Sequence, residues 1–163
     1  MVDYGETHQA ERDAAERRTW RTKFRERAKA SGPRDKILIE AKTRLAKISD
    51  QAADEAFWLV VRENCERVED AARFVPVAFG DITPFIDDED RELITAAASL
   101  LPAGNMTEET WGAWTSTLKS ETGRKGKGLF MPLRKALTGM ERGPSVGDML
   151  VLMGRARALQ RLA

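Results

Sequence analysis

Apolar residues recur at intervals of three and four along most of this chain, and that spacing restricts it to helices. Two such series are Ile37, Leu38, Ala41, Leu45, Ile48 and Trp111, Trp114, Leu118. No stretch of useful length alternates apolar with polar residues, as a half-buried strand would. The sequence therefore predicts an all-α protein.

Residues that cap or break helices divide the chain into expected elements. The N-terminal part holds a charge-dense helix over residues 9–30, a second helix that reaches Ile48, and a long helix that is capped by Asp54 and ends before Pro76. A loop over residues 77–87 precedes a helix over residues 93–101. Three more helices follow: one opened by Thr107, one with Pro132 in its first turn and Gly139 at its end, and one capped by Ser145.

The ends of the chain are basic and its middle is acidic. Residues 1–50 have a net charge of +4, residues 51–110 of −10, and residues 111–163 of +7. A basic segment favours a polyanion such as nucleic acid, because cations that contact phosphates release condensed counterions. The alternative is that the acidic and basic segments neutralise each other within the fold.

The sequence predicts neither a metal site nor a cofactor. With one cysteine, Cys65, and one histidine, His8, the chain has no internal disulfide and no cluster of Cys and His ligands for zinc. The acids at residues 87–90 suit the first turn of a helix and lack the spacing of a calcium loop. Because no run resembles a membrane span or a secretory signal, we expect a soluble, cytoplasmic protein.

The segment TGRKGKG, residues 122–128, interleaves three glycines with Arg124, Lys125 and Lys127. Glycines allow close backbone approach, and three cations suit a phosphate backbone. The segment is not a Walker loop, because Lys127 is followed by glycine, and it is not a dinucleotide fingerprint, because no strand precedes it. We therefore predict phosphate contacts at the three cations, with a purely solubilising role as the alternative.

The next helix is expected to bury one face and expose another. Leu133, Ala136 and Leu137 face the core by their spacing, which leaves Arg134 and Lys135 on the flank. A planar guanidinium in such a place can read a base edge or brace a loop. The tight loop over residues 141–145 follows, and loops between helices often bind ligands. For Trp111 and Trp114, helical spacing favours core packing over stacking on bases.

Residues 111–162 closely resemble the C-terminal anticodon-binding domain of bacterial glutamyl-tRNA synthetases. The resemblance is carried by TGRKGKGLFMPLRKALTG at residues 122–139, by Gly143-Pro144 and by GRARAL at residues 154–159. It reaches back more weakly through FWLVVREN at residues 57–64, so about residues 54–163 match. The resemblance implies an all-helical cage that binds the anticodon loop of glutamate tRNA, with contacts at Arg134, Gly143, Pro144 and Val146.

Residues 1–50 have no counterpart that we identify in this family, so we predict a basic helical leader over residues 1–50 and an anticodon-binding-like domain over residues 51–163. The family's catalytic domain carries elements such as His-Ile-Gly-His and Lys-Met-Ser-Lys-Ser, and neither occurs here. The chain by itself is thus not expected to activate glutamate, although the family it resembles is an aminoacyl-tRNA ligase.

The sequence leaves three functions to distinguish. The first is a non-catalytic tRNA-binding module. The second is an interaction or structural protein that keeps the fold but docks on a partner protein or assembly without binding RNA. The third is a subunit that completes a split synthetase, with residues 1–50 contacting a separate catalytic subunit. In the first case the partner is tRNA, most simply glutamate tRNA.

Overall fold

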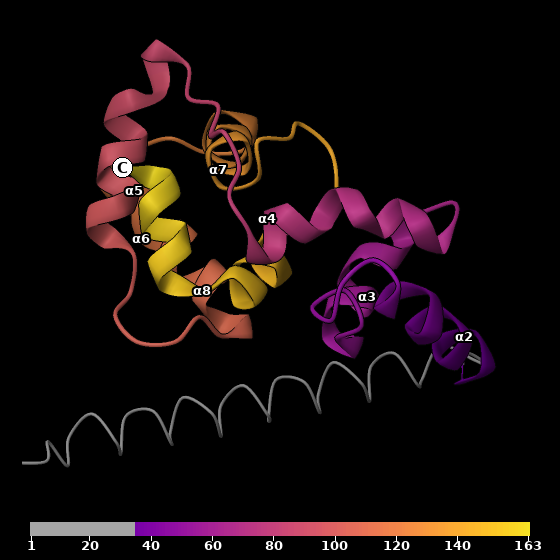
Figure 1. Ribbon diagram of the computed structural model, residues 1–163. Coiled ribbons are helices and arrows are strands. Elements are labelled where there is room, and N and C mark those ends of the chain that lie inside the picture. Colours follow the sequence, from indigo (N-terminus) through magenta and orange to yellow (C-terminus); the bar gives the residue numbers. More distant parts are fainter. Residues whose placement is uncertain (1–34) are drawn as a thin grey trace, which may run out of the picture.

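A computed structural model describes residues 35–163 (Figure 1). These residues form helices and contain no strand, which confirms the predicted all-α class. The elements are α2 Asp35–Ala46, α3 Glu55–Val61, the 3-10 helices η1 Arg62–Asn64 and η2 Val68–Phe74, α4 Val75–Phe79, the 3-10 helix η3 Asp88–Asp90, α5 Arg91–Leu100, α6 Glu108–Thr122, α7 Lys127–Thr138 and α8 Val146–Leu162. The helix predicted over residues 9–30 lies outside the described part.

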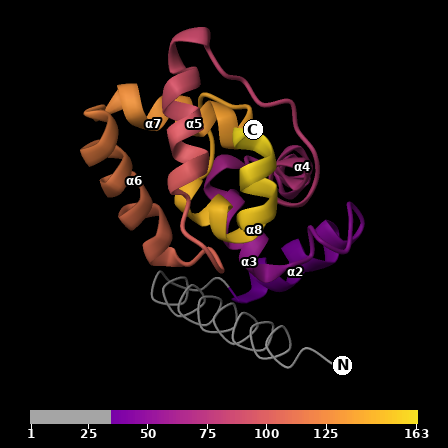
Figure 2. The same ribbon diagram turned by 90° about the vertical axis from the view of Figure 1, so that its left-hand side faces the viewer.

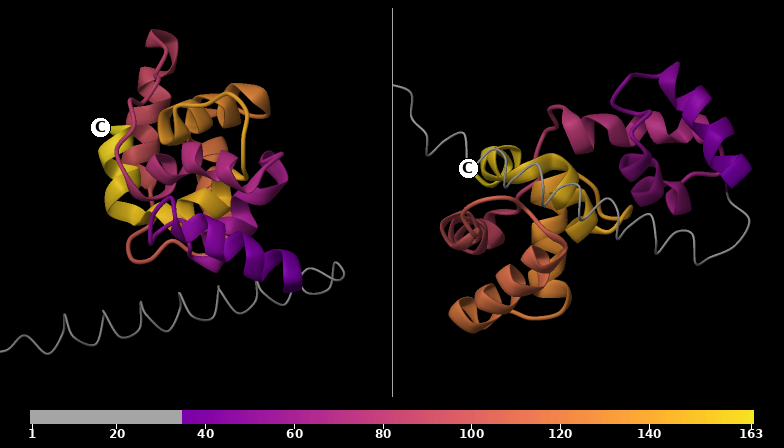
Figure 3. Two further views of the ribbon diagram at one scale, coloured as in Figure 1. Left: turned by 45° about the vertical axis from the view of Figure 1, so that its right-hand side comes forward. Right: turned by 90° about the horizontal axis from the view of Figure 1, so that it is seen from below.

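Helix α8 is the centre of the assembly. It packs against α4, α6 and α7, and Figure 2 shows it passing between α4 and the α6–α7 pair. Helices α2 and α3 lie at one end of the molecule, and α5 and α6 lie at the other (Figures 1 and 3). Helix α8 joins these two ends, because it contacts α3 as well as α5 and α6.

One apolar core runs through all of these helices. It extends from Ala41 and Leu45 of α2 to Leu162 of α8, and it includes the predicted face of Leu133, Ala136 and Leu137. The side chains of residues 35–40 are not among those described. The division at residue 50 stays a prediction, although α2 lies before it and shares this core.

The prediction of one long helix between Asp54 and Pro76 is wrong. Asp54 does cap α3, since its Oδ1 accepts a hydrogen bond from the amide of Ala56 at 2.9 Å. The helix is then interrupted at Cys65, which is extended, and η2 begins three residues later. The carboxylate of Asp70 accepts from the amides of Glu66 and Arg67 at 3.0 and 2.9 Å, and these bonds lower its pKa. Asp70 thereby caps a new helix at a place where apolar spacing predicts continuity.

Prolines account for two further corrections. Pro76 lies in the first turn of α4, where its missing amide is tolerated, so the predicted loop starts after Phe79 and not at residue 77. Pro132 lies inside α7, which begins five residues earlier than predicted. A proline here leaves the Gly128 carbonyl without its helical donor, and Arg124 Nη1 donates to that carbonyl at 3.4 Å.

Helix α8 contains a sharp kink at Gly154, where φ is 77° and ψ is 167°. This backbone conformation is almost restricted to glycine, because a Cβ atom clashes with the residue's own backbone. The kink divides α8 into a first half that follows the α7–α8 loop and a second half that carries Arg155, Arg157 and Arg161. Its position sets the direction in which those three arginines leave the helix.

We predict that Gly154→Ala lowers the free energy of unfolding by about 1 to 3 kcal/mol, the usual cost of forcing a side chain into a glycine-only conformation. No neighbour lies within 4 Å of a Cβ placed at Gly154, so the loss would be conformational and not steric. Urea titration measures it. The matched control is Gly112→Ala in α6, where space is equally open and the helix should gain about 0.5 to 1 kcal/mol. Equal effects of the two substitutions would contradict this account.

Among residues 35–163, none of the helices has the length and apolar character needed to cross a membrane. Within the same part of the chain, no three His, Cys, Asp or Glu side chains are arranged to hold a metal ion. Three of the four acids of residues 87–90 form ion pairs: Asp87 with Lys135, Asp88 with Arg91, and Asp90 with Arg124.

Candidate nucleic-acid interface

Local hydrogen bonds fix both ends of the α7–α8 loop, residues 139–145. Gly139 ends α7 in the predicted left-handed conformation, with φ of 68°, and its amide donates to Lys135 O at 2.9 Å. A Cβ atom there would lie 3.2 Å from the Thr83 carbonyl oxygen, so glycine is also required by the close approach of the α4–α5 segment. Ser145 caps α8 as predicted, because its Oγ accepts from the amide of Asp148 at 3.3 Å.

Arg134 joins α7 to this loop. Its Nη1 donates to the carbonyl oxygen of Pro144 at 3.0 Å, and a Cβ placed at Gly143 would lie 3.9 Å from the same nitrogen. Burial lowers the pKa of Arg134, but a guanidinium titrates so far above neutral pH that it stays charged. A guanidinium carries five N–H donors, and Pro144 accepts from one nitrogen, so donors remain for a ligand.

The four residues predicted to contact an anticodon lie together but differ in exposure. Arg134 and Gly143 are half-buried, Pro144 is buried, and the side chain of Val146 is only 5% exposed because it belongs to the core. A ligand at this loop would therefore meet the Arg134 side chain and the loop backbone. These contacts stay predictions, and the geometry limits Val146 to a main-chain contact.

The three cations of residues 124–127 have different surroundings. Arg124 forms an ion pair with Asp90 and donates through Nη2 to Glu89 O at 2.7 Å, so its guanidinium anchors the α6–α7 loop to the start of α5. Lys125 and Lys127 are exposed, and neither forms an ion pair with another described residue. Helix α7 begins at Lys127 with glycine as its cap and no acid in its first turn. The two lysines at this end of α7 are therefore more accessible to an anion than Arg124 is.

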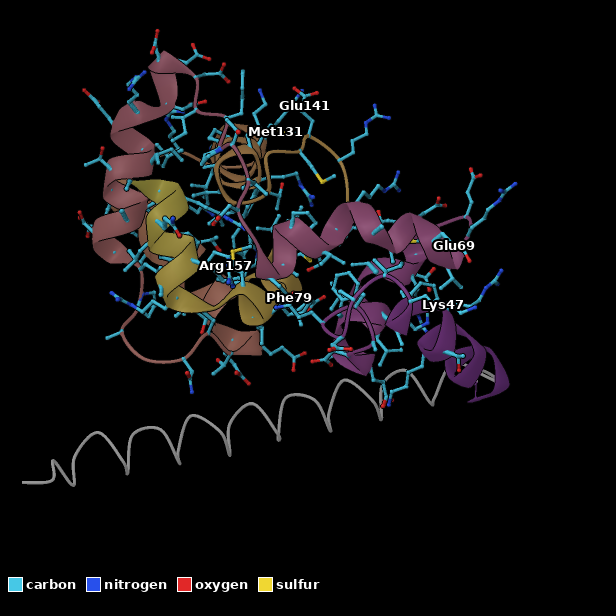
Figure 4. The ribbon with its side chains drawn as sticks, in the orientation of Figure 1. Lys47, Glu69, Phe79, Met131, Glu141 and Arg157 are labelled. Atoms are coloured by element: carbon cyan, nitrogen blue, oxygen red, sulfur yellow. The ribbon has the colours of Figure 1, made fainter. Side chains whose placement is uncertain are left out.

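Lys135 is on the flank of α7, as predicted, but it is used within the fold. Its Nζ lies 3.2 Å from Asp87 and 3.4 Å from Glu141, and the hydrogen bond to Asp87 raises its pKa. The same ammonium is 4.9 Å from the centre of the Phe85 ring. Figure 4 labels Glu141 in the loop that follows α7.

The arginines in the second half of α8 donate hydrogen bonds to backbone carbonyls. Arg155 Nε donates to Pro102 O at 2.8 Å, and Arg157 Nη2 donates to Phe79 O at 2.9 Å, where α8 crosses α4 (Figure 4). Arg161 is 3% exposed and donates to carbonyls of both α4 and α7. Much of the +7 charge of residues 111–163 thus has internal partners, which neither composition nor spacing reveals.

An aromatic stack at the α6–α7 corner was missed by the sequence analysis. Trp114 is in the core, as its spacing predicts, and its indole Nε1 donates to Ala97 O at 3.1 Å. Trp111, in contrast, is half-buried, and Phe130 of α7 is 44% exposed beside it. The two ring centres are 6.2 Å apart. Spacing gave no signal for this exposure, because Phe130 lies three residues before Leu133 and seven before Leu137 and so falls at the edge of the apolar face.

Comparison with known proteins places most of the chain in one family. The model of the family described as an anticodon binding domain matches residues 23–163, farther toward the N-terminus than the resemblance seen by inspection. Glutamate-tRNA ligase 2 of Hyphomonas neptunium is 54% identical over 120 residues, which is 74% of this chain and 27% of that protein. Glutamate-tRNA ligase 1 of Rhodospirillum rubrum is 50% identical over 111 residues, and that of Bartonella quintana is 42% identical over 139 residues. They cover 68% and 78% of this chain, and 25% and 28% of those proteins, so the chain spans about a quarter of these relatives.

Proposed function

Because the chain belongs to the anticodon-binding domain family, we propose that it is a non-catalytic tRNA-binding module that recognises glutamate tRNA in the cytoplasm. The observation that carries the proposal is the contact of Arg134 with the Pro144 carbonyl. This contact holds a charged, donor-rich group beside the half-buried backbone of Gly143, in a loop fixed at both ends. Such an arrangement suits the edges of unpaired bases, which are the usual target of sequence-specific RNA recognition.

We assign the phosphate contacts chiefly to Lys125 and Lys127. Both lysines are exposed, with Lys125 in the loop just before α7 and Lys127 as its first residue, and the helix dipole favours an anion at this end. Arg124 remains a candidate, but we expect a smaller contribution because Asp90 and Glu89 already accept from its guanidinium.

The ligase activity in the names of the relatives belongs to proteins of which this chain spans about a quarter. The present sequence lacks both nucleotide-binding elements of the catalytic domain. We therefore propose that activation of glutamate needs a catalytic domain, either joined to this module or meeting it as a separate subunit. A contact of that subunit with residues 1–50 is part of the same proposal.

The direct test is a titration of the 163-residue chain against a panel of transcribed tRNAs at several salt concentrations. We expect the tightest binding to glutamate tRNA and an affinity that falls steeply as salt rises, because phosphate contacts release counterions. Absence of binding to every tRNA at low salt would contradict the proposal. Equal affinity for all tRNAs would leave RNA binding intact and remove the anticodon-reading part.

We predict that the double substitution Lys125→Ala, Lys127→Ala weakens the binding of all tRNAs to a similar extent. The slope of log K against log salt should fall in magnitude by about one unit for each lysine. The control is Lys42→Ala, Lys47→Ala, which removes the same charge from exposed positions on α2 and just after it, away from α7 (Figure 4). An equal loss of slope in the two double variants would mean that only net charge matters.

A further inference from the structure

Phe130 is one of two large apolar side chains that are clearly exposed among the described residues, and the other is Phe85. Phe130 projects from the first turns of α7, close to the basic α6–α7 loop. A single exposed apolar side chain is ordinary, but Phe130 adjoins the half-buried Trp111, and a contiguous aromatic patch rimmed by polar residues is typical of an interaction site.

The ring is supported by a stack that leads into the core. Trp111 lies 6.2 Å from Phe130 at an interplanar angle of 38°, and Trp111 meets the buried Trp114 edge-on at 5.8 Å. On α8, a Cβ placed at Gly147 would lie 3.1 Å from Cβ and Cγ of Trp111, so the indole is also pressed against that backbone. Phe130 therefore rests on a tryptophan held on more than one side, which limits the entropy that the aromatic pair loses on binding a flat partner.

This stack is continuous with the proposed tRNA interface. Lys127, Phe130 and Arg134 follow one another at spacings of three and four, so they share the exposed strip of α7. The α7–α8 loop and the start of α8 connect the two parts of this surface, because Arg134 contacts Pro144 and Gly147 lies against Trp111. An RNA that reaches Arg134 and the lysines must pass over Phe130.

Phe85 is less suited to RNA, although it is also exposed. The ammonium of Lys135 lies beside its ring, and Asp87 and Glu141 both pair with that ammonium. Two carboxylates near the ring disfavour an approaching phosphate. Phe130 instead has Lys127 three residues before it and Arg134 four residues after it on its own helix, and residues 122–138 contain no acid.

We propose that Phe130, supported by Trp111, stacks on an unpaired base of the bound tRNA. This inference rests on the proposed function and adds to it a contact that recognises the flat face of a base and not its sequence. Aromatic faces bind any base, so the contact raises affinity while Arg134 and the loop supply selectivity. It also connects the phosphate-binding and anticodon-reading parts of the interface.

The test compares Phe130→Ala, Phe130→Leu and Phe130→Tyr by titration of the full chain with transcribed glutamate tRNA. We expect the alanine and leucine variants to bind about 5- to 150-fold more weakly and the tyrosine variant to stay within about twofold, because only tyrosine keeps a stacking face. Phe85→Ala serves as the control and should leave affinity unchanged. The unfolding midpoint of each variant separates lost contacts from lost folding.

Three outcomes would overturn the inference in different ways. If leucine binds as well as phenylalanine, the contact is merely apolar and no base stacks there. If Phe130→Ala retains affinity while Arg134→Ala loses it, the proposed function stands and this contact is absent. If the unmodified chain binds no tRNA, the proposed function fails first and the inference fails with it.

Discussion

Replacing Arg161 by leucine should lower the free energy of unfolding by about 3 to 5 kcal/mol, the largest loss we expect from any single change in the described structure. Arg161 Nη1 donates to the carbonyls of Val77 and Leu137 at 2.7 Å, and Nη2 donates to those of Pro76 and Gly80 at 3.1 and 2.9 Å. Leucine fills much of the space but leaves four backbone acceptors without this donor. Guanidinium chloride titration measures the loss.

The charge of Arg161 is part of this interaction. Burial lowers its pKa to about 10, which still leaves the guanidinium protonated at neutral pH, so four charge-assisted hydrogen bonds offset its desolvation. Arg161→Lys keeps the charge but has one nitrogen where four acceptors must be spanned, so it should fall between the parent and Arg161→Leu. Arg155→Leu is the comparison at a half-buried arginine and should cost less. A loss below about 1 kcal/mol for Arg161→Leu would contradict this account.

The second large effect is on recognition. Arg134→Ala should weaken binding of glutamate tRNA about 5- to 150-fold, the range expected for losing one guanidinium contact to a base edge, and should weaken other tRNAs less. The reason is that Arg134 presents its remaining donors beside Gly143 while Pro144 holds the guanidinium in place. Filter binding against several tRNAs measures the difference.

Two controls separate reading of bases from simple charge. Arg142→Ala removes a cation from the exposed part of the same loop, so it should affect all tRNAs alike. Arg134→Lys keeps the charge but lacks the planar fork, so glutamate tRNA should still be weakened. Equal losses for every tRNA with Arg134→Ala would assign Arg134 to the phosphate backbone. A stability measurement accompanies each variant, because the lost hydrogen bond from the charged guanidinium to Pro144 is worth about 1.5 to 3 kcal/mol.

Most helix ends could be predicted because their signals are local. Asp54, Gly139 and Ser145 act through groups within four residues of themselves. Thr107 does so too, since its amide donates to Thr110 Oγ1 at 2.8 Å. The interruption at Cys65 was missed because its signal is weak. Asp70 caps the new helix from three residues beyond Arg67, and one more acid does not stand out in so charged a segment. Prolines were misplaced because the first turn and the interior of a helix both tolerate them when the freed carbonyl finds another donor.

The candidate site could be predicted only in part, because partners that are distant in sequence decide what a cation does. Arg134, Arg155 and Arg161 look alike in the sequence, yet only Arg134 lies against an open loop. Arg161 meets carbonyls that are 84 residues away, and Arg124 meets an acid 34 residues away. Phe130 was missed for the same reason, since its support comes from α6 and α8. The role predicted for residues 1–50 remains a prediction.

The position of Arg161 also bears on synthesis of the protein. Arg161 donates to carbonyls of α4 that are synthesised long before it. Val77, for example, precedes Arg161 by 84 residues. At rates of synthesis of about 5 to 20 residues per second, those groups are made several seconds before their donor. Water or transient partners must therefore satisfy the carbonyls of α4 and of the end of α7 until α8 emerges. The α7–α8 loop is thus expected to acquire its final shape as one of the last events of folding.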